Sequence, residues 1–262
     1  MQLYASNSQL LYMALLKAFG YEKIRLSPVS PTFFANVAKL LNIDIEFVDI
    51  KLDFSADANV LHNFFETFTP KADIVFQNWG ESTGEAKVFV KKSAGCLVAE
   101  FHDEVIFEKT KLFLAGGIKK GRLWNYDVVS LGIKDRAKPC SVDEALVARS
   151  NEVVDYFDEV FRGNIYFDTL KVGRETLKTH YPILLKPSLY CPKEDIYQEL
   201  QAKGIDVQVR FKPLYRMSLF QSDFLPVSEE LYKAILLLPL DKKIVDPLFE
   251  VLQKYRHRGC SF

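Results

Sequence analysis

The sequence has no excess of either charge, because 34 Lys and Arg residues balance 34 Asp and Glu residues over its 262 positions. A chain without net charge has no overall field that attracts nucleic acid or an anionic membrane surface, so we expect neither as a partner. It also has no apolar run near the roughly 20 residues that a membrane-spanning helix needs. Its 48% of apolar residues suffice for a large buried core, which predicts a globular protein.

Cysteine is scarce, and metal-binding patterns are missing. The four cysteines stand far apart and form no C-x-x-C pair: Cys96, Cys140, Cys191 and Cys260. Their spacing argues against a disulfide framework and a structural zinc site, and a reducing cytoplasm fits it best. The four histidines are scattered, and no G-x-S-x-G, G-x-G-x-x-G or Walker loop occurs. Neither a metal site nor a familiar catalytic loop is therefore predicted.

Helix and strand patterns alternate over the first half of the chain. Apolar residues recur at helical spacing, or fill short strand-like runs, in four successive segments: 10–18, 32–41, 43–50 and 74–76. Such a rhythm is typical of β-α-β units, whose strands run parallel under a cover of helices. We therefore predict that residues 1–141 form an α/β domain around a mostly parallel central sheet.

The second half has a different rhythm. An amphipathic pattern over residues 142–161 predicts a long connecting helix. Strand patterns follow at 181–185 and 207–211, and helix patterns at 193–202, 229–237 and 245–255. We predict that residues 142–262 form this helix and a smaller α+β domain.

Three stretches of the second half, taken in order, resemble one family. Residues 126–136 read YDVVSLGIKDR, residues 193–215 read KEDIYQELQAKGIDVQVRFKPLY, and residues 226–240 read PVSEELYKAILLLPL. This series is similar to the DegT/DnrJ/EryC1/StrS family of sugar aminotransferases. The resemblance implies the fold-type-I scaffold, pyridoxal phosphate as cofactor and a homodimer. It also implies transamination of a nucleotide-linked keto sugar in surface polysaccharide biosynthesis.

The resemblance places the cofactor phosphate at residues 6–11, SNSQLL. Asn7 and Ser8 would then lie at a helix N-terminus, whose backbone N–H groups attract anions. An ordinary helix cap that binds nothing is the alternative. Within residues 31–36, PTFFAN, Phe33 falls where the family stacks an aromatic ring on the pyridine, and a core aromatic is the alternative.

The carboxylate that faces the pyridine nitrogen in the family has no counterpart in register. That carboxylate keeps the ring an electron sink. One alignment deletes the motif, and the other puts Asn78 in place of the aspartate and Glu81 in place of the following amide. An amide can hydrogen-bond to the ring but supplies no charge. The family's phosphate-binding asparagine corresponds to Lys134, which would pair with an anion or lie on the surface.

The family's Schiff-base lysine corresponds to one of two neighbours. Residues 86–100, AKVFVKKSAGCLVAE, are similar to the run around that lysine, shortened, and leave Lys92 or Lys91 in its place. A catalytic lysine must be desolvated so that its amine is neutral and nucleophilic. A solvated pair at a strand end is the alternative reading.

Three further residues are candidates for substrate binding by resemblance. Arg210 and Tyr215 replace two histidines of the family, and His180 keeps the family's pattern. An arginine can grip a carboxylate or phosphate of the substrate. A water-facing arginine on an edge strand and a structural histidine are the alternatives.

The resemblance thus leaves three hypotheses. The first is a compact aminotransferase that uses pyridoxal phosphate. The second is a non-catalytic relative that binds a sugar nucleotide or a partner protein without the cofactor. The third is a reshaped pocket in which Lys134 and Arg210 contact an anionic sugar nucleotide. Relative to the family, the chain lacks a block of sheet and helix, and a homodimer would cover the sheet edge thereby exposed.

Overall fold

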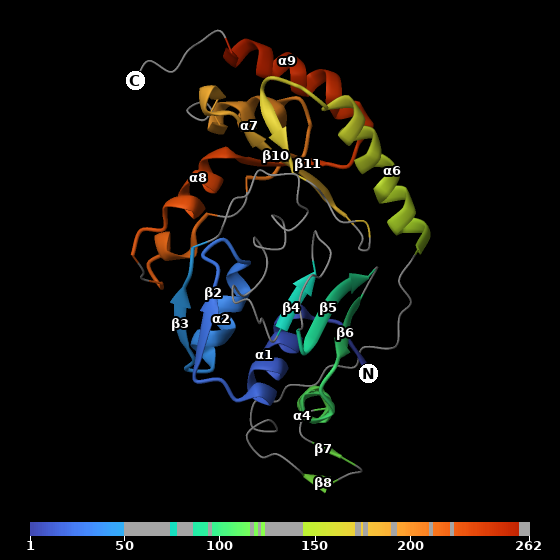
Figure 1. Ribbon diagram of the computed structural model, residues 1–262, viewed down its shortest axis with the longest axis vertical. Helices are drawn as coiled ribbons and strands as arrows, with labels where there is room; N and C mark the ends of the chain where they lie inside the picture. The colour runs from blue at the N-terminus through green and yellow to red at the C-terminus, as the bar shows by residue number, and fades with distance from the viewer. Residues whose placement is uncertain are drawn as a thin grey trace.

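The structure of the chain is a computed structural model. It describes residues 1–49, 74–77, 86–93, 96–115, 118–119, 122–123, 144–170, 174, 178–189, 193–209, 212–220 and 223–256. Figure 1 shows them as two lobes, one above the other. We call the described residues up to 123 the N-terminal lobe and those from 144 onward the C-terminal lobe.

The main sheet of the N-terminal lobe is mixed, where the sequence predicted a mostly parallel one. Its strand order is β1 (Gln2–Ala5), β6 (Cys96–Phe101), β5 (Val88–Ser93) and β4 (Ile74–Gln77). Strands β4 and β5 are parallel, but β6 is antiparallel to both of its neighbours. Only residues 94–95 separate β5 from β6, and so short a connection can join only antiparallel strands.

A parallel pair of strands lies beside this sheet, as the β-α-β pattern predicted. It consists of β2 (Lys23–Leu26) and β3 (Asp44–Phe47), connected by helix α2 (Thr32–Leu40). A small antiparallel pair, β7 (Ile118–Lys119) and β8 (Arg122–Leu123), completes the described strands of this lobe.

Helix α1 (Ser8–Phe19) packs against both α2 and α4 (Glu104–Leu114). Its apolar residues Leu11 and Leu15, one turn apart, are fully buried. The helix ends at Gly20, whose φ of 72° is the left-handed conformation that favours glycine.

The C-terminal lobe is an antiparallel sheet under helices. Its strand order is β11 (Ile235–Pro239), β10 (His180–Leu185) and β9 (Phe167–Thr169). The helices are α6 (Glu144–Val160), α7 (Lys193–Ala202), α8 (Pro226–Ala234) and α9 (Val245–Arg256). Three short 3-10 turns complete it: η2 (Pro187–Leu189), η3 (Leu214–Arg216) and η4 (Lys242–Ile244).

Two predicted elements of this lobe differ from the structure. The helix predicted over 229–237 ends at Ala234, and the chain continues directly as strand β11. A short apolar run such as ILLL fits a buried strand as well as a helix, and here it pairs with β10. The strand predicted over 207–211 is reduced, in its described residues, to a single bridge between Gln208 and Leu237.

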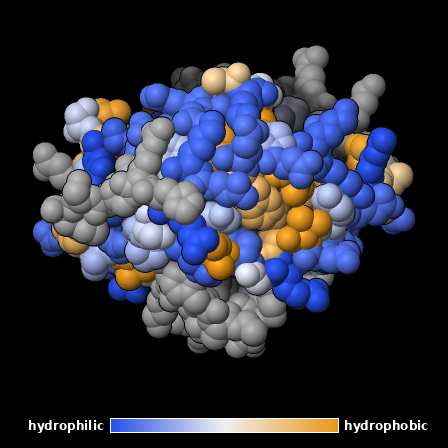
Figure 2. All heavy atoms as spheres, turned by 90° about the horizontal axis from the view of Figure 1, so that it is seen from above, coloured by the Kyte–Doolittle hydropathy of each residue, from blue (hydrophilic) through white to orange (hydrophobic). Residues whose placement is uncertain are grey.

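Each lobe has its own hydrophobic core. One core joins α1, α2 and the main sheet, and it includes Leu214 and Phe220 from the second half of the chain. The other joins α6 to α9 and the sheet of the C-terminal lobe. Figure 2 looks onto the C-terminal lobe from above and shows mostly hydrophilic side chains, with a larger apolar area right of the centre and smaller ones elsewhere. The boundary between residues 141 and 142 stays a prediction.

Two further features bear on the sequence predictions. Cys96, at the start of β6, is disulfide-bonded, although the cysteine spacing argued against a disulfide framework. Spacing along the sequence does not report which cysteines meet in the fold. Among the described helices, none combines the length and the apolar character that crossing a membrane demands.

Candidate functional site

The N-terminus of α1 is capped by the side chain of Asn7, the residue that precedes the helix. Asn7 Oδ1 accepts hydrogen bonds from the backbone N–H of Gln9 at 2.8 Å and of Leu10 at 3.1 Å. Asn7 is exposed and Ser8 is half-buried. The amide oxygen thus holds the place that an anion takes at a helix N-terminus. Phosphate binding by Asn7 and Ser8 stays a prediction, and it requires this cap to move aside.

Phe33 belongs to an aromatic cluster at the start of α2. Its ring centroid lies 4.1 Å from that of Phe34 and 6.2 Å from that of Tyr12, which belongs to α1. Burial raises the pKa of the Tyr12 hydroxyl. The cluster holds α1 against α2, so Phe33 has a packing role, and its stacking on a pyridine ring stays a prediction.

Lys91 and Lys92 lie within strand β5 of a hairpin rather than in a loop. Their backbone partners in β6 are Val98 and Leu97. The Nζ of Lys91 lies 3.1 Å from Glu100 Oε2, and the two side chains are 29% and 33% exposed. An ion pair uses the charged ammonium, whereas imine formation needs the neutral amine. The side chain of Lys92 lies outside the part of the chain that the structure describes.

Four of the predicted site residues also lie outside the described residues: Asn78, Glu81, Lys134 and Arg210. His180 is described, and it begins β10 opposite Pro239. One of its ring nitrogens, Nδ1, lies 3.1 Å from the hydroxyl of Thr179. Two predicted site residues of the C-terminal lobe are described, His180 and Tyr215. Neither of them contacts Lys91.

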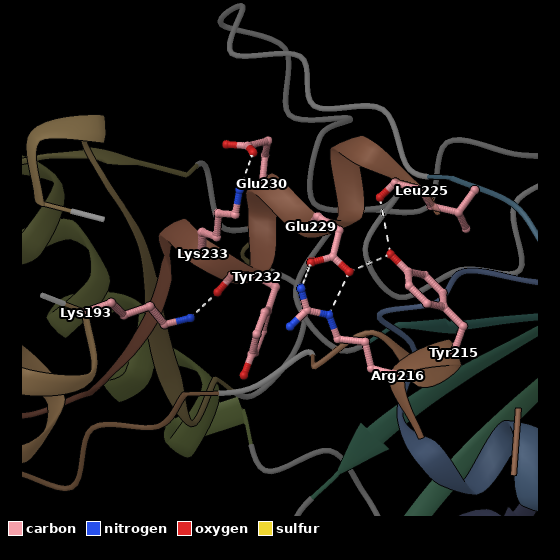
Figure 3. Close-up of polar contacts among 8 residues, drawn as sticks. All are labelled: Lys193, Tyr215, Arg216, Leu225, Glu229, Glu230, Tyr232 and Lys233. Atoms are coloured by element: carbon pink, nitrogen blue, oxygen red, sulfur yellow. Dashed lines mark hydrogen bonds and ion pairs between the residues drawn. The ribbon is translucent and has the colours of Figure 1, made fainter. Parts of the chain in front are cut away.

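A polar cluster lies where the two lobes meet, and Figure 3 shows it. Glu229, in the first turn of α8, is only 2% exposed. Its Oε1 accepts from Tyr215 Oη and from Arg216 Nε, each at 2.8 Å, and its Oε2 accepts from Arg216 Nη2. The pKa of Tyr215 is raised to about 12. Burial is the largest cause, and the hydrogen bond to Glu229 is the second. The buried carboxylate is thus neutralised by a two-point arginine pair, which also raises the pKa of Arg216.

The same cluster continues to Lys193, the first residue of α7. Lys193 is 1% exposed, and its Nζ donates to the backbone oxygen of Tyr232 while lying 4.5 Å from the centroid of that ring. The guanidinium of Arg216 lies 5.3 Å from the same centroid. Loss of hydration lowers the pKa of Lys193 to about 8, because burial disfavours the charged form.

Sequence reasoning identified Tyr215 but missed the partners that fix it. Glu229 and Tyr232 lie in a stretch that supported the resemblance and Arg216 directly follows another, but nothing in their spacing shows that they meet. One signal was present: Glu229 follows Pro226, and acidic residues are common in the first turn of a helix.

Two of the described residues that the resemblance assigns to the cofactor are engaged with other groups. The first N–H groups of α1 are taken by Asn7, and the amine of Lys91 is paired with Glu100. Within the described ranges, no group of three or more His, Cys, Asp or Glu side chains is arranged to hold a metal ion.

Comparison with known proteins finds sequence similarity to sugar aminotransferases. Residues 140–250 match the family model described as the DegT/DnrJ/EryC1/StrS aminotransferase family. A UDP-4-amino-4,6-dideoxy-N-acetyl-beta-L-altrosamine transaminase of Campylobacter jejuni is 33% identical over 191 residues, which are 64% of this chain and 50% of that protein. The Helicobacter pylori protein of the same name is 29% identical over 153 residues, 53% of this chain and 41% of its own. This chain spans about half the length of the curated relatives it matches.

Solved structures extend the likeness to almost the whole chain. Helicobacter pylori PseC, an aminotransferase of pseudoaminic acid biosynthesis, superimposes with a TM-score of 0.70 at 18% identity, covering 97% of this chain and 86% of its own. A DegT DnrJ EryC1 StrS aminotransferase from Brucella abortus gives a TM-score of 0.66 at 14% identity, with 98% and 86% covered. Residues 140–250 are therefore similar to the DegT/DnrJ/EryC1/StrS aminotransferase family, and the chain has the fold-type-I fold of these solved sugar aminotransferases.

Proposed function

We propose that this chain serves the pyridoxal-phosphate-dependent transamination of a nucleotide-linked keto sugar in surface polysaccharide biosynthesis. The observation that carries the proposal is the match of residues 140–250 to the aminotransferase family together with the UDP-sugar transaminases that are its relatives. The shared fold supports it, because the elements that build a sugar aminotransferase recur in order along the chain.

Lys92 is the amine that this proposal places at the reaction centre. Its neighbour Lys91 already pairs with Glu100, and successive side chains of a strand point to opposite faces of the sheet. The remaining assignments are proposals too: Asn78, Glu81 and Lys134 near the cofactor, and His180, Arg210 and Tyr215 near the sugar nucleotide. Tyr215 would bind the sugar nucleotide while its hydroxyl donates a hydrogen bond to Glu229.

The second candidate is a relative that binds a sugar nucleotide or a partner protein without the cofactor and does not transaminate. Two contacts favour it: the cap of Asn7 on α1 and the ion pair of Lys91 with Glu100. Both use groups that the cofactor would need. Each contact must break before these residues can serve a phosphate or an imine.

Absorbance spectra of the purified chain with added pyridoxal phosphate separate the two candidates. The first predicts a visible band that Lys92→Ala abolishes, while Lys111→Ala, on the surface of α4, keeps it. Lys91→Ala is expected to keep the band as well. Absence of any band from a protein with an unchanged circular dichroism spectrum would contradict the first candidate and leave the second.

A homodimer, a cytoplasmic location and the two-domain boundary complete the proposal. Sedimentation equilibrium tests the dimer, in which a second copy would cover the open sheet edge. Cell fractionation tests the location, against which the disulfide of Cys96 weighs.

A further inference from the structure

Helix α8 starts at the junction of the lobes without a capping side chain of its own. Pro226 occupies its first turn, and the residue before it, Leu225, offers no side-chain acceptor. The first N–H groups of any helix lack partners within the helix and are costly to leave unpaired when buried. Ser228, in this first turn, is fully buried, so the groups around it need partners from elsewhere in the chain.

Asp49 supplies the missing cap from the other lobe. It follows strand β3, and its carboxylate accepts from Val227 N at 2.9 Å, from Ser228 N at 2.9 Å and from Ser228 Oγ at 2.6 Å. These three bonds join residues 178 and 179 positions apart. A carboxylate at a helix N-terminus also gains from the helix dipole.

The segment 212–220 ties the same end of α8 to the N-terminal lobe a second time. Glu229 is held by Tyr215 and Arg216, as described above. The neighbouring Leu214 donates its N–H to the backbone oxygen of Pro28 at 2.7 Å, in the loop after β2. Leu214 also packs in the core of the N-terminal lobe.

The other end of α8 belongs to the C-terminal lobe. Leu231 and Ala234 are part of that lobe's core, and the helix continues directly into strand β11. One short helix therefore runs from contacts with one lobe into the central packing of the other. If the lobes move relative to one another, either the contacts of the first turn of α8 with the N-terminal lobe break or the helix moves away from the core of the C-terminal lobe.

We propose that Asp49 is a clamp between the lobes, and that its bonds to the first turn of α8 set the orientation of one lobe relative to the other. The inference goes beyond the proposed function and holds for either candidate. Asp49 is a positioning residue in this account, because it acts on the junction through α8.

Distance measurements between spin labels test the clamp in the full-length chain. Labels on non-natural amino acids at Lys39 in α2 and Glu159 in α6, both exposed, report the separation of the lobes without using cysteines. The wild-type chain is expected to give one narrow distance distribution. Asp49→Ala is expected to broaden it at least twofold and to speed hydrogen exchange at the amides of residues 227 and 228 about tenfold.

Asp103→Ala is the matched control, because Asp103 caps α4 within a single lobe by accepting from Ile106 N at 3.0 Å. It is expected to keep the narrow distribution. A wild-type distribution in Asp49→Ala, with faster exchange confined to the two amides, would show a purely local cap and overturn the proposal. Should Asp49→Ala not fold, Asp49→Asn and Ser228→Ala each weaken the clamp, and unchanged distributions in both would likewise overturn it.

Discussion

Lys193 keeps an amine almost completely away from water, and this has a measurable cost. Its pKa falls from an ordinary 10.5 to about 8 through burial. Between these two pH values the unfolded chain binds more protons at this site than the folded chain. The free energy of unfolding therefore rises with pH across the window from about 8 to 10.5, and below it the buried charge costs roughly 3 kcal/mol.

Lys193→Met is predicted to remove this pH dependence, because the thioether fills similar space without a titrating group. The stability of the variant relative to wild type is expected to fall by roughly 3 kcal/mol from pH 8 to 10.5, measured by urea unfolding at a series of pH values. Lys233→Met is the control, since Lys233 is 53% exposed and its ion pair with Glu230 lies at the surface, where such pairs contribute little to stability. Parallel pH curves for wild type and Lys193→Met would show that this lysine is not desolvated.

The contacts of single residues show why the polar cluster was harder to predict than the helices and strands. The sequence placed Lys193 at the start of a helix, where a lysine usually lies in water. Only the fold shows that Tyr232 from α8 covers it. In the same way, Tyr215 was a candidate from its position in the chain, but its partner Glu229 lies 14 residues away on another element.

At the scale of elements, the cap of α1 gives a direct prediction. Asn7→Ala removes the acceptor for two N–H groups and is expected to lower the free energy of unfolding by about 1 kcal/mol. Chemical denaturation measures this loss. Ser8→Ala, one position further along, is the matched control and is expected to change stability by less than about 0.5 kcal/mol. Equal effects of the two substitutions would mean that Asn7 does not cap the helix.

Periodicity predicted the amphipathic elements well, and of the two buried strands of the C-terminal lobe it predicted β10 but not β11. Helices α1, α2 and α6 each carry one apolar face, and the structure confirms them. Strand β11 is apolar on both faces, so its run of ILLL carries no period that separates strand from helix. The direction of β6 was missed for a different reason: the mixed sheet follows from the short turn after β5.

At the scale of the whole molecule, the order of local patterns was enough to predict the scaffold. Contacts between distant parts were not predictable, because they depend on how the lobes meet. Asp49 and Val227 are 178 residues apart, and nothing in the local patterns around them shows that they meet. Lys91 and Lys92 could be singled out from the sequence, but their place in a hairpin and the pairing of Lys91 with Glu100 could not.

Transamination and cofactor-free binding of a sugar nucleotide share one requirement, the recognition of a nucleotide-linked sugar. Isothermal titration calorimetry of the purified chain against a panel of UDP-linked N-acetylated amino sugars, with the free sugars as controls, tests it most directly. The account predicts saturable binding of at least one UDP-sugar at one site per chain and none of the free sugars. Heats no larger than those of dilution across the panel, from a protein whose circular dichroism shows it folded, would contradict the account.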